Sequence, residues 1–262
     1  MKIGIIGLGK MGEALVKGLQ RSYAITATTR SLESARQTSK RLKIQCHTDN
    51  LKLAGAADVI MISVKPHQAQ AVLQEIAPVL NSKKLLISVC AALSAEQIYS
   101  WAGSRSPTIR AMPNTPVLVG EGMTVICQGP KVNFGHLKIA SQIFGAVGKT
   151  AVVEEELMDG VTGLSGCGPA YGYLIIEALS EAGVKVGLRR ETATLLAAQT
   201  LLGAAQMVLQ AGKHPAALKD EVTTPAGCTV DGLMALEEGK LRVTLIKAVL
   251  AASRRSREMG RI

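Results

Sequence analysis

The chain has 262 residues, of which 47% are hydrophobic and 19% are charged, and this composition excludes an extensively disordered protein. Only one Trp, four Tyr and two Phe are present, which disfavours a protein that stacks nucleic-acid bases on aromatic side chains. The net charge of +10 allows either a nucleic acid or an anionic metabolite as the ligand.

The first 155 residues alternate short β-type runs with helical stretches, which is typical of a largely parallel sheet covered by crossover helices. The runs that predict strands are Lys2–Ile6, Ala24–Thr29, Ile44–His47, Val59–Val64, Leu85–Val89, Thr108–Met112, Met123–Cys127 and Thr150–Val153. Continuous apolar runs such as residues 59–62 suit strands that are buried on both faces. We therefore predict a doubly wound α/β domain over residues 1–155.

Three glycines follow the first strand with the spacing G-x-G-x-x-G, at the start of a helix. In this setting Gly7 makes the tight turn, Gly9 lets a ligand approach the backbone, and Gly12 allows the helix to pack closely on the strand. The helix N-terminus adds unpaired N–H groups and the positive end of its dipole, both of which favour phosphate. The motif predicts a dinucleotide site, with a glycine turn that only packs as the alternative.

The end of the second strand indicates which dinucleotide binds. An enzyme that uses NAD usually places an acidic residue there, against the ribose 2′-hydroxyl, but this chain has Thr29, Arg30 and Ser31, and the nearest acid is Glu33 in the next helix. Arg30 can pair with a 2′-phosphate, and the two hydroxyls can donate hydrogen bonds to it. The pattern favours NADPH, with NADH as the second possibility, unless Arg30 is an ordinary surface arginine.

The fourth predicted strand ends in Ser63, Val64, Lys65 and Pro66. The carboxyl edge of a doubly wound sheet holds the ligand crevice, so we expect Lys65 and its neighbours to line the nicotinamide half of the site. The alternative is a connecting loop that contacts nothing. His67 is interpreted as a loop residue without a chemical role.

After residue 155 the chain becomes rich in Ala and Leu, and we predict an all-helical domain over residues 156–262. The predicted helices are Leu157–Leu164, Pro169–Val186, Arg190–Ala211, Pro215–Val222 and Val230–Met259. Residues 191–210 are long and apolar enough to suggest a membrane span, but Thr and Gln interrupt them every turn or two. A helix that is apolar almost all round also suits a subunit interface, and we expect that here.

The five cysteines, at positions 46, 90, 127, 167 and 228, form no C-x-x-C pair and leave an odd member. This pattern indicates neither a disulfide framework nor a metal site. The N-terminus shows none of the three regions of a signal peptide. We expect a cytoplasmic protein that needs no metal.

Three further stretches make the interpretation specific. They are Arg110–Pro116 (RAMPNTP), Val161–Tyr171 (VTGLSGCGPAY) and Leu218–Thr229 (LKDEVTTPAGCT). Together with the glycine motif and Val64-Lys65-Pro66, they resemble the pyrroline-5-carboxylate reductase family along essentially the whole chain. The resemblance implies reduction of 1-pyrroline-5-carboxylate to L-proline by hydride transfer from NAD(P)H, the last step of proline synthesis.

The resemblance also implies a Rossmann-type domain followed by an all-helical dimerisation domain. The protein would be a homodimer or, as the larger alternative, a decamer of dimers, with a small-molecule substrate and neither nucleic acid nor membrane as a partner. The cofactor contacts it implies are Ile6, Gly7, Leu8, Gly9, Lys10, Met11, Asn50, Ser63, Val64, Lys65 and Pro66. The substrate contacts it implies are Thr162, as the candidate catalytic residue, and Thr224, Pro225, Ala226, Gly227, Cys228 and Thr229.

The expected chemistry needs no covalent nucleophile, because a protonated imine is already a strong electrophile. Thr162 would orient the ring nitrogen, and the loop ending at Thr229 would hold the substrate carboxylate with backbone N–H groups and hydroxyls. Plain helix capping is the alternative role for that loop.

The chain departs from the family pattern in two places. Cys167 stands where the family has Ser, so a weak S–H donor replaces a hydroxyl. Ala226 stands where the family has Gly, and it would be strained at positive φ.

Two other classes of protein remain open at this point. One is a related NAD(P)-dependent imine or β-hydroxyacid reductase. The other is a non-catalytic protein that senses dinucleotides or binds nucleic acid, which the positive charge allows.

Overall fold

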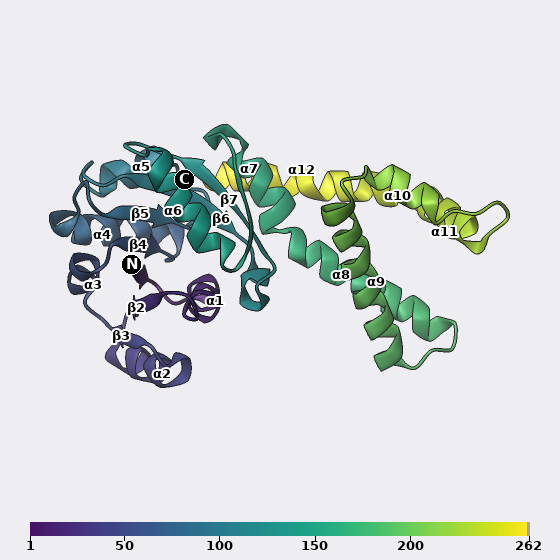
Figure 1. Ribbon diagram of the computed structural model, residues 1–262, viewed down its shortest axis with the longest axis horizontal. Helices are drawn as coiled ribbons and strands as arrows, with labels where there is room; N and C mark the ends of the chain where they lie inside the picture. The colour runs from purple at the N-terminus through teal and green to yellow at the C-terminus, as the bar shows by residue number, and fades with distance from the viewer. Residues whose placement is uncertain (261–262) are drawn as a thin grey trace. The chain divides into compact units, whose positions relative to one another are not determined.

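The computed structural model describes residues 1–260, and the last two residues of the predicted helical domain, 261 and 262, lie outside the described residues. The chain forms two compact units, one made of residues 1–167 together with the chain from Leu250 onward, and the other of residues 168–249 (Figure 1). The domain boundary predicted after residue 155 rests on the change from strands to helices, and it stays a prediction.

The first unit is built on one eight-stranded sheet with the order β3-β2-β1-β4-β5-β6-β7-β8. The strands are β1 (Lys2–Ile6), β2 (Ala24–Thr28), β3 (Gln45–His47), β4 (Val59–Ile62), β5 (Leu85–Ser88), β6 (Thr108–Pro113), β7 (Gly122–Gln128) and β8 (Gly148–Val152). Neighbouring strands are parallel except for β6 and β7. The strand order reverses between β1 and β4, which is where a doubly wound sheet opens its ligand crevice. The predicted α/β class is confirmed.

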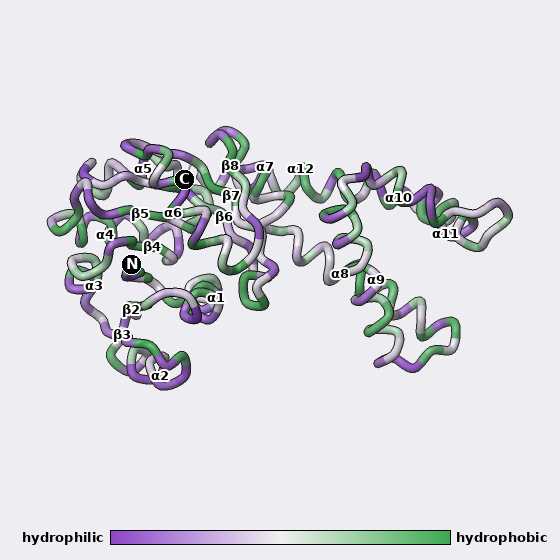
Figure 2. The backbone as a smooth tube through the Cα atoms, in the orientation of Figure 1, coloured by the Kyte–Doolittle hydropathy of each residue, from purple (hydrophilic) through white to green (hydrophobic). Residues whose placement is uncertain are grey.

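Helices cover both faces of this sheet. One face packs against α1 (Lys10–Leu19) and α6 (Phe134–Gly145), and the other against α3 (Asn50–Ala56), α4 (Pro66–Ile76) and α5 (Ala95–Trp101). The helices α2 (Leu32–Leu42), η1 (Ala77–Val79) and η2 (Thr115–Val119) complete the crossovers. In β4, Met61 belongs to the first core and Ile60 to the second, which explains its continuous apolar run. Figure 2 colours the backbone by the hydropathy of each residue.

The predicted helix Leu157–Leu164 is not one regular helix. After β8 the chain forms η3 (Glu155–Leu157), one turn of α-helix in α7 (Met158–Val161) and a π-helical turn, η4 (Thr162–Gly166). In η4 the N–H of Cys167 donates to the Thr162 carbonyl at 2.9 Å, five residues back. The π-helix is rare, occurs mostly as single turns, and is frequently found at functional sites.

The second unit is entirely helical. It contains α8 (Gly168–Lys185), α9 (Arg190–Ala211), α10 (Pro215–Glu221), α11 (Cys228–Glu238) and the first part of α12 (Leu241–Met259). Helices α8 and α9 pack closely, because Gly183 has no side chain: a Cβ there would lie 2.7 Å from that of Ala193. The prediction of one helix over 230–259 is wrong. The chain breaks at Gly239 and at Lys240, which has a left-handed φ of 55°.

Helix α9 is predominantly exposed in the single chain. Among its 22 residues the buried hydrophobic ones are Ala193 and Ala197, whereas Leu195, Leu202 and Leu209 are 67%, 49% and 66% exposed. By length and composition it is the helix within residues 1–260 that could span a membrane. These three leucines recur every seven residues and lie on one side of the helix.

Candidate active site

The glycine turn after β1 has the geometry that the sequence predicts. Gly7 has a φ of 93°, and a Cβ there would lie 2.6 Å from Cγ1 of Val64. A Cβ on Gly12 would lie 2.2 Å from the Gly7 carbonyl oxygen, whereas one on Gly9 would meet no atom within 4 Å. The first and third glycines therefore allow close packing, and the second leaves the backbone open to a ligand.

This turn borders a cavity of about 690 Å³ at the carboxyl ends of β1, β2 and β4. The predicted cofactor residues that line it are Ile6, Gly7, Leu8, Gly9, Thr29, Arg30, Asn50, Ser63, Val64 and Lys65. A cavity of this volume is large enough for a cofactor. The structure thus brings together the three segments that the sequence assigned separately to the dinucleotide.

Five predicted cofactor residues do not line the cavity. Lys10, Met11 and Gly12 belong to the first turn of α1, beneath the glycine turn. Ser31 is the N-cap of α2, where its hydroxyl accepts a hydrogen bond from the Ser34 N–H at 3.2 Å. Pro66 is the first residue of α4. These residues shape the elements that border the cavity, and their direct contact with a cofactor stays a prediction.

The rim of the cavity beyond β2 is positive. Arg30 is exposed and, among the described residues, has no ion-pair partner. The nearest acid in sequence, Glu33, accepts a hydrogen bond from Gln37 along α2 at 3.2 Å and does not line the cavity. This rim suits a phosphate better than a ribose hydroxyl that needs an acidic partner.

Several residues of the cavity were not predicted from the sequence. Two of them, Thr28 and Glu75, bind the predicted residue Asn50: the Thr28 hydroxyl donates to its Oδ1 at 2.6 Å, and its Nδ2 donates to Glu75 at 2.8 Å. His67 also lines the cavity, so its interpretation as a loop residue is wrong: it lies in the first turn of α4. The signal was available, because residues 67, 71 and 75 are four apart and share one face of a helix that begins at a proline.

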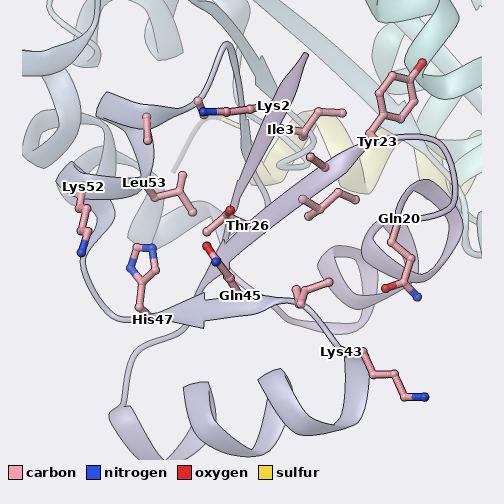
Figure 3. Close-up of a pocket in the computed structure, with 15 residues that line it drawn as sticks. Lys2, Ile3, Gln20, Tyr23, Thr26, Lys43, Gln45, His47, Lys52 and Leu53 are labelled. Carbon is pink, nitrogen blue, oxygen red and sulfur yellow. The ribbon is translucent and has the colours of Figure 1, made fainter.

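A second cavity, of about 600 Å³, lies beside β1, β2 and β3 and contains none of the predicted site residues (Figure 3). Its lining includes Lys2, Lys43 and Lys52, together with Thr26 and His47. It is therefore separate from the cavity beside the glycine turn.

Thr162 is the first residue of the π-helical turn and is partly buried. Its hydroxyl donates a hydrogen bond to the Met158 carbonyl at 2.9 Å. A hydroxyl has two acceptor lone pairs besides its one proton, so this bond leaves the Thr162 oxygen able to accept from another donor.

A partly buried ion pair anchors the chain that leads into this turn. Arg110 on β6 is 7% exposed, and its Nη1 lies 3.1 Å from a carboxylate oxygen of Glu155 that also accepts from the Ala95 N–H at 2.8 Å. Burial and the nearby Glu155 raise the pKa of the Cys127 thiol to about 11. The Cys127 thiol therefore stays protonated at neutral pH and is not a nucleophile.

The predicted substrate loop lies in the second unit, whereas Thr162 lies in the first. Residues 224–227 form a hydrogen-bonded turn in which the Gly227 N–H donates to the Thr224 carbonyl at 3.0 Å. Proline at the second position and positive φ at the third define a type II turn, and Ala226 has a φ of 58°. The strain expected for alanine at this position is present.

The turn leads into α11, whose first two residues are Cys228 and Thr229. The first N–H groups of a helix have no partner within it and point outward with the positive end of the dipole. Thr224, Pro225, Ala226 and Cys228 are exposed and Thr229 is partly buried. The loop therefore offers an open set of donors to an anionic group.

The sheet with its glycine turn, cavity and positive rim defines the class of the protein as an NAD(P)-dependent oxidoreductase. Two family models agree, one described as "NADP oxidoreductase coenzyme F420-dependent" over residues 2–92 and one as "Pyrroline-5-carboxylate reductase dimerisation" over residues 155–259. The chain is 42% identical to pyrroline-5-carboxylate reductase of Pisum sativum over 262 residues, which cover 98% of this chain and 96% of the relative. It therefore belongs to the pyrroline-5-carboxylate reductase family, as the motifs predict.

Solved structures agree with this assignment. Pyrroline carboxylate reductase of Plasmodium falciparum, solved with NADP bound, is 38% identical with a TM-score of 0.88, over 99% of this chain and 98% of that one. The enzyme of Coxiella burnetii is also 38% identical with a TM-score of 0.90, over 98% and 97% of the two chains. The match to a dimerisation family indicates that this protein is an oligomer.

Proposed function

We propose that this protein reduces 1-pyrroline-5-carboxylate to L-proline with NADPH as the hydride donor. The observation that carries the proposal is the cavity beside the glycine turn, with Arg30 on its rim, in a chain that is 42% identical to a pyrroline-5-carboxylate reductase over 98% of its length. The full-length similarity favours this activity over a β-hydroxyacid reductase or a non-catalytic dinucleotide-binding protein.

The cofactor supplies a hydride when it is bound, and the first unit has the groups to hold it. The backbone at Gly9 and the N-terminus of α1 would bind the pyrophosphate. Arg30 and Thr29 would bind the 2′-phosphate, and Ser63 and Lys65 would lie along the nicotinamide half.

The chain's contribution to the chemistry is to hold and orient a substrate that is already electrophilic. The Thr162 hydroxyl donates its hydrogen bond to the Met158 carbonyl, so its free lone pairs would accept a hydrogen bond from the N–H of a protonated ring nitrogen. This orientation selects the iminium form, which is the form that accepts a hydride. The N–H groups at the start of α11 and the Thr229 hydroxyl would hold the substrate carboxylate, so that the reacting carbon keeps a fixed position.

The oligomer is inferred to be a homodimer whose interface includes α9, with the decamer of dimers as the larger alternative. The apolar side of α9 at Leu195, Leu202 and Leu209 supports this, because burying these side chains against a second copy removes them from water. The cytoplasmic location stays a prediction.

Initial rates of NADPH oxidation test the proposed function. The purified protein should oxidise NADPH when 1-pyrroline-5-carboxylate is added and should form proline in equal amount. A six-membered cyclic imine and NADH, each tried in turn, measure the selectivity for the ring and for the cofactor. Protein that binds NADPH but does not turn over this substrate would contradict the proposal.

A further inference from the structure

The π-helical turn contains a backbone carbonyl whose usual α-helical donor is absent. In an α-helix the carbonyl of Ser165 would accept from the N–H four residues later, but that residue is Pro169, which has no N–H. The Ser165 hydroxyl, which is buried, has no hydrogen-bond partner among the described residues and so does not tie the turn to its surroundings. A carbonyl without a partner is costly when it is shielded from water.

Asn114 supplies the missing donor. It follows β6 directly, is partly buried, and its Nδ2 donates to the Ser165 carbonyl at 3.2 Å. Its Oδ1 accepts from the Met123 N–H in β7 at 2.9 Å. That second bond fixes the orientation of the amide, because a backbone N–H can only donate to the oxygen.

The amide therefore joins the turn to the sheet through two strands. Asn114 directly follows β6, the N–H of Met123 in β7 orients its amide, and the bond to Ser165 restrains the turn that begins at Thr162. The side chain of Met112, on β6, lies near the same turn, with its Cε 3.7 Å from where a Cβ on Gly166 would be. The sheet is rigid and buried, so a turn fixed to it has one geometry.

We propose that Asn114 is a positioning residue of the reductase, which fixes the π-helical turn and thereby the Thr162 hydroxyl. This inference rests on the role of Thr162 in the proposed function. The motif Met112-Pro113-Asn114, which carries part of the family resemblance, thereby acquires a structural role.

The substitution Asn114→Asp tests the inference because it removes the donor and keeps the acceptor. At pH 8 the new carboxylate would still accept from Met123 but would repel the Ser165 carbonyl. We expect kcat for 1-pyrroline-5-carboxylate to fall by about 5- to 150-fold, the range for leaving a buried polar group unsatisfied, with a smaller change in KM and an unchanged Kd for NADPH.

The pH dependence separates positioning from a general loss of structure. Burial and the neighbouring carbonyl favour the protonated carboxyl, which donates through its O–H, so kcat relative to wild type should recover as the pH falls. The control is Asn133→Asp, the same substitution at the N-cap of α6, where the oxygen that accepts from the His136 N–H is retained. The kcat of Asn133→Asp should match that of the wild-type protein at every pH. A wild-type kcat for Asn114→Asp at pH 8, or an equal loss at all pH values, would overturn the inference.

Hydrogen exchange gives a readout that does not depend on turnover. The Cys167 N–H, which closes the π-helical turn, should exchange faster in Asn114→Asp than in Asn133→Asp, and equal rates would overturn the inference. If the wild-type protein did not reduce 1-pyrroline-5-carboxylate, the proposed function would be contradicted. The hydrogen-exchange comparison would still test whether Asn114 fixes the π-helical turn.

A second pair of variants serves if the aspartate variant does not fold. Asn114→Ala should lose activity, and adding Pro169→Ala should restore part of it by returning an N–H to the position that can satisfy Ser165. The same activity with and without Pro169→Ala would overturn the inference.

Discussion

The two halves of the proposed site are built in opposite ways. The cofactor cavity is bordered by strands and helices whose apolar side chains are fully buried, such as Leu15, Ile60 and Leu73 at 0% exposure. The substrate loop stands before an exposed helix, and the second unit that contains it leaves long apolar side chains in contact with water. The cofactor half has a buried frame within a single chain, and the substrate half leaves an apolar surface that we propose a second copy covers.

The difference indicates that cofactor binding and substrate binding depend on different parts of the protein. A cavity with a rigid frame loses little conformational entropy on binding its ligand, so the cofactor half can be preformed. The substrate loop stands on a helical unit whose apolar side chains are proposed to be buried only when the subunits meet. Assembly should therefore control turnover without controlling cofactor affinity.

The largest effect should come from charging the apolar side of α9. The double variant Leu195→Glu and Leu202→Glu should be monomeric, because carboxylates at a buried interface are strongly unfavourable. Turnover of 1-pyrroline-5-carboxylate should then be lost while NADPH still binds, which size-exclusion chromatography with light scattering and NADPH fluorescence would measure.

The control for this variant is Phe134→Glu, which charges an 81% exposed side chain of the first unit. It should leave the oligomer and the activity intact. A double variant of α9 that remains an active oligomer would contradict the proposal that α9 forms the interface on which turnover depends.

Arg30→Asp should act on the cofactor half alone. It replaces a cation beside the expected 2′-phosphate with an anion, and the loss of a charge-assisted hydrogen bond costs about 1.5–3 kcal/mol before repulsion is added. The Kd for NADPH should rise far more than the Kd for NADH, with the oligomer unchanged. Equal changes in the two dissociation constants would show that this residue does not discriminate between them.

Thr229→Val should act on the substrate half alone, because it keeps the size of the side chain and removes one donor. Losing one hydrogen bond to a charged group costs about 1.5–3 kcal/mol, so kcat/KM for 1-pyrroline-5-carboxylate should fall by about 10- to 150-fold. NADPH titration should give the wild-type Kd. An unaltered kcat/KM would assign this loop to helix capping.

The smallest effect should come from Ala226→Gly, which relieves the left-handed backbone of the substrate loop. An alanine at positive φ costs about 1–2 kcal/mol, offset in part by the greater entropy of glycine in the unfolded chain. We expect the free energy of unfolding to rise by up to about 1 kcal/mol, with cofactor affinity unaffected. A lower Tm for the glycine variant would mean that other contacts stabilise the alanine.

The sequence predicted the first half of the molecule well because its signals are local. Strand β4 has four consecutive buried apolar residues, and the three glycines of the turn have distinct steric roles that depend only on neighbouring atoms. Prediction failed where the deciding contact was distant in sequence. Nothing near residue 165 reveals that an asparagine 51 residues earlier satisfies its carbonyl.

The break at Gly239 shows another limit of predicting helices from the sequence. The pattern over residues 230–259 is helical on both sides of it, and one glycine inside a helix costs only about 1 kcal/mol, so propensity does not separate a tolerated glycine from a break. The roles of Thr162 and of the loop at Thr224–Thr229 came from the family resemblance rather than from residue patterns, and they stay proposals.

The end of α12 connects the last residues of the chain to the first unit. Ser256 is 5% exposed, and its hydroxyl donates to Asp159 on α7 at 2.7 Å, beside Arg257 at 3.7 Å from the same carboxylate. The first unit is therefore discontinuous in sequence, with the helical unit inserted between its π-helical turn and the last part of α12. On the ribosome the sheet can form early, since domains fold from the N-terminus as they emerge. The cofactor-binding unit becomes whole only after the end of α12 has been synthesised, so a chain truncated at Leu250 would keep strands β1 to β8 and still lack the closing segment of its first unit.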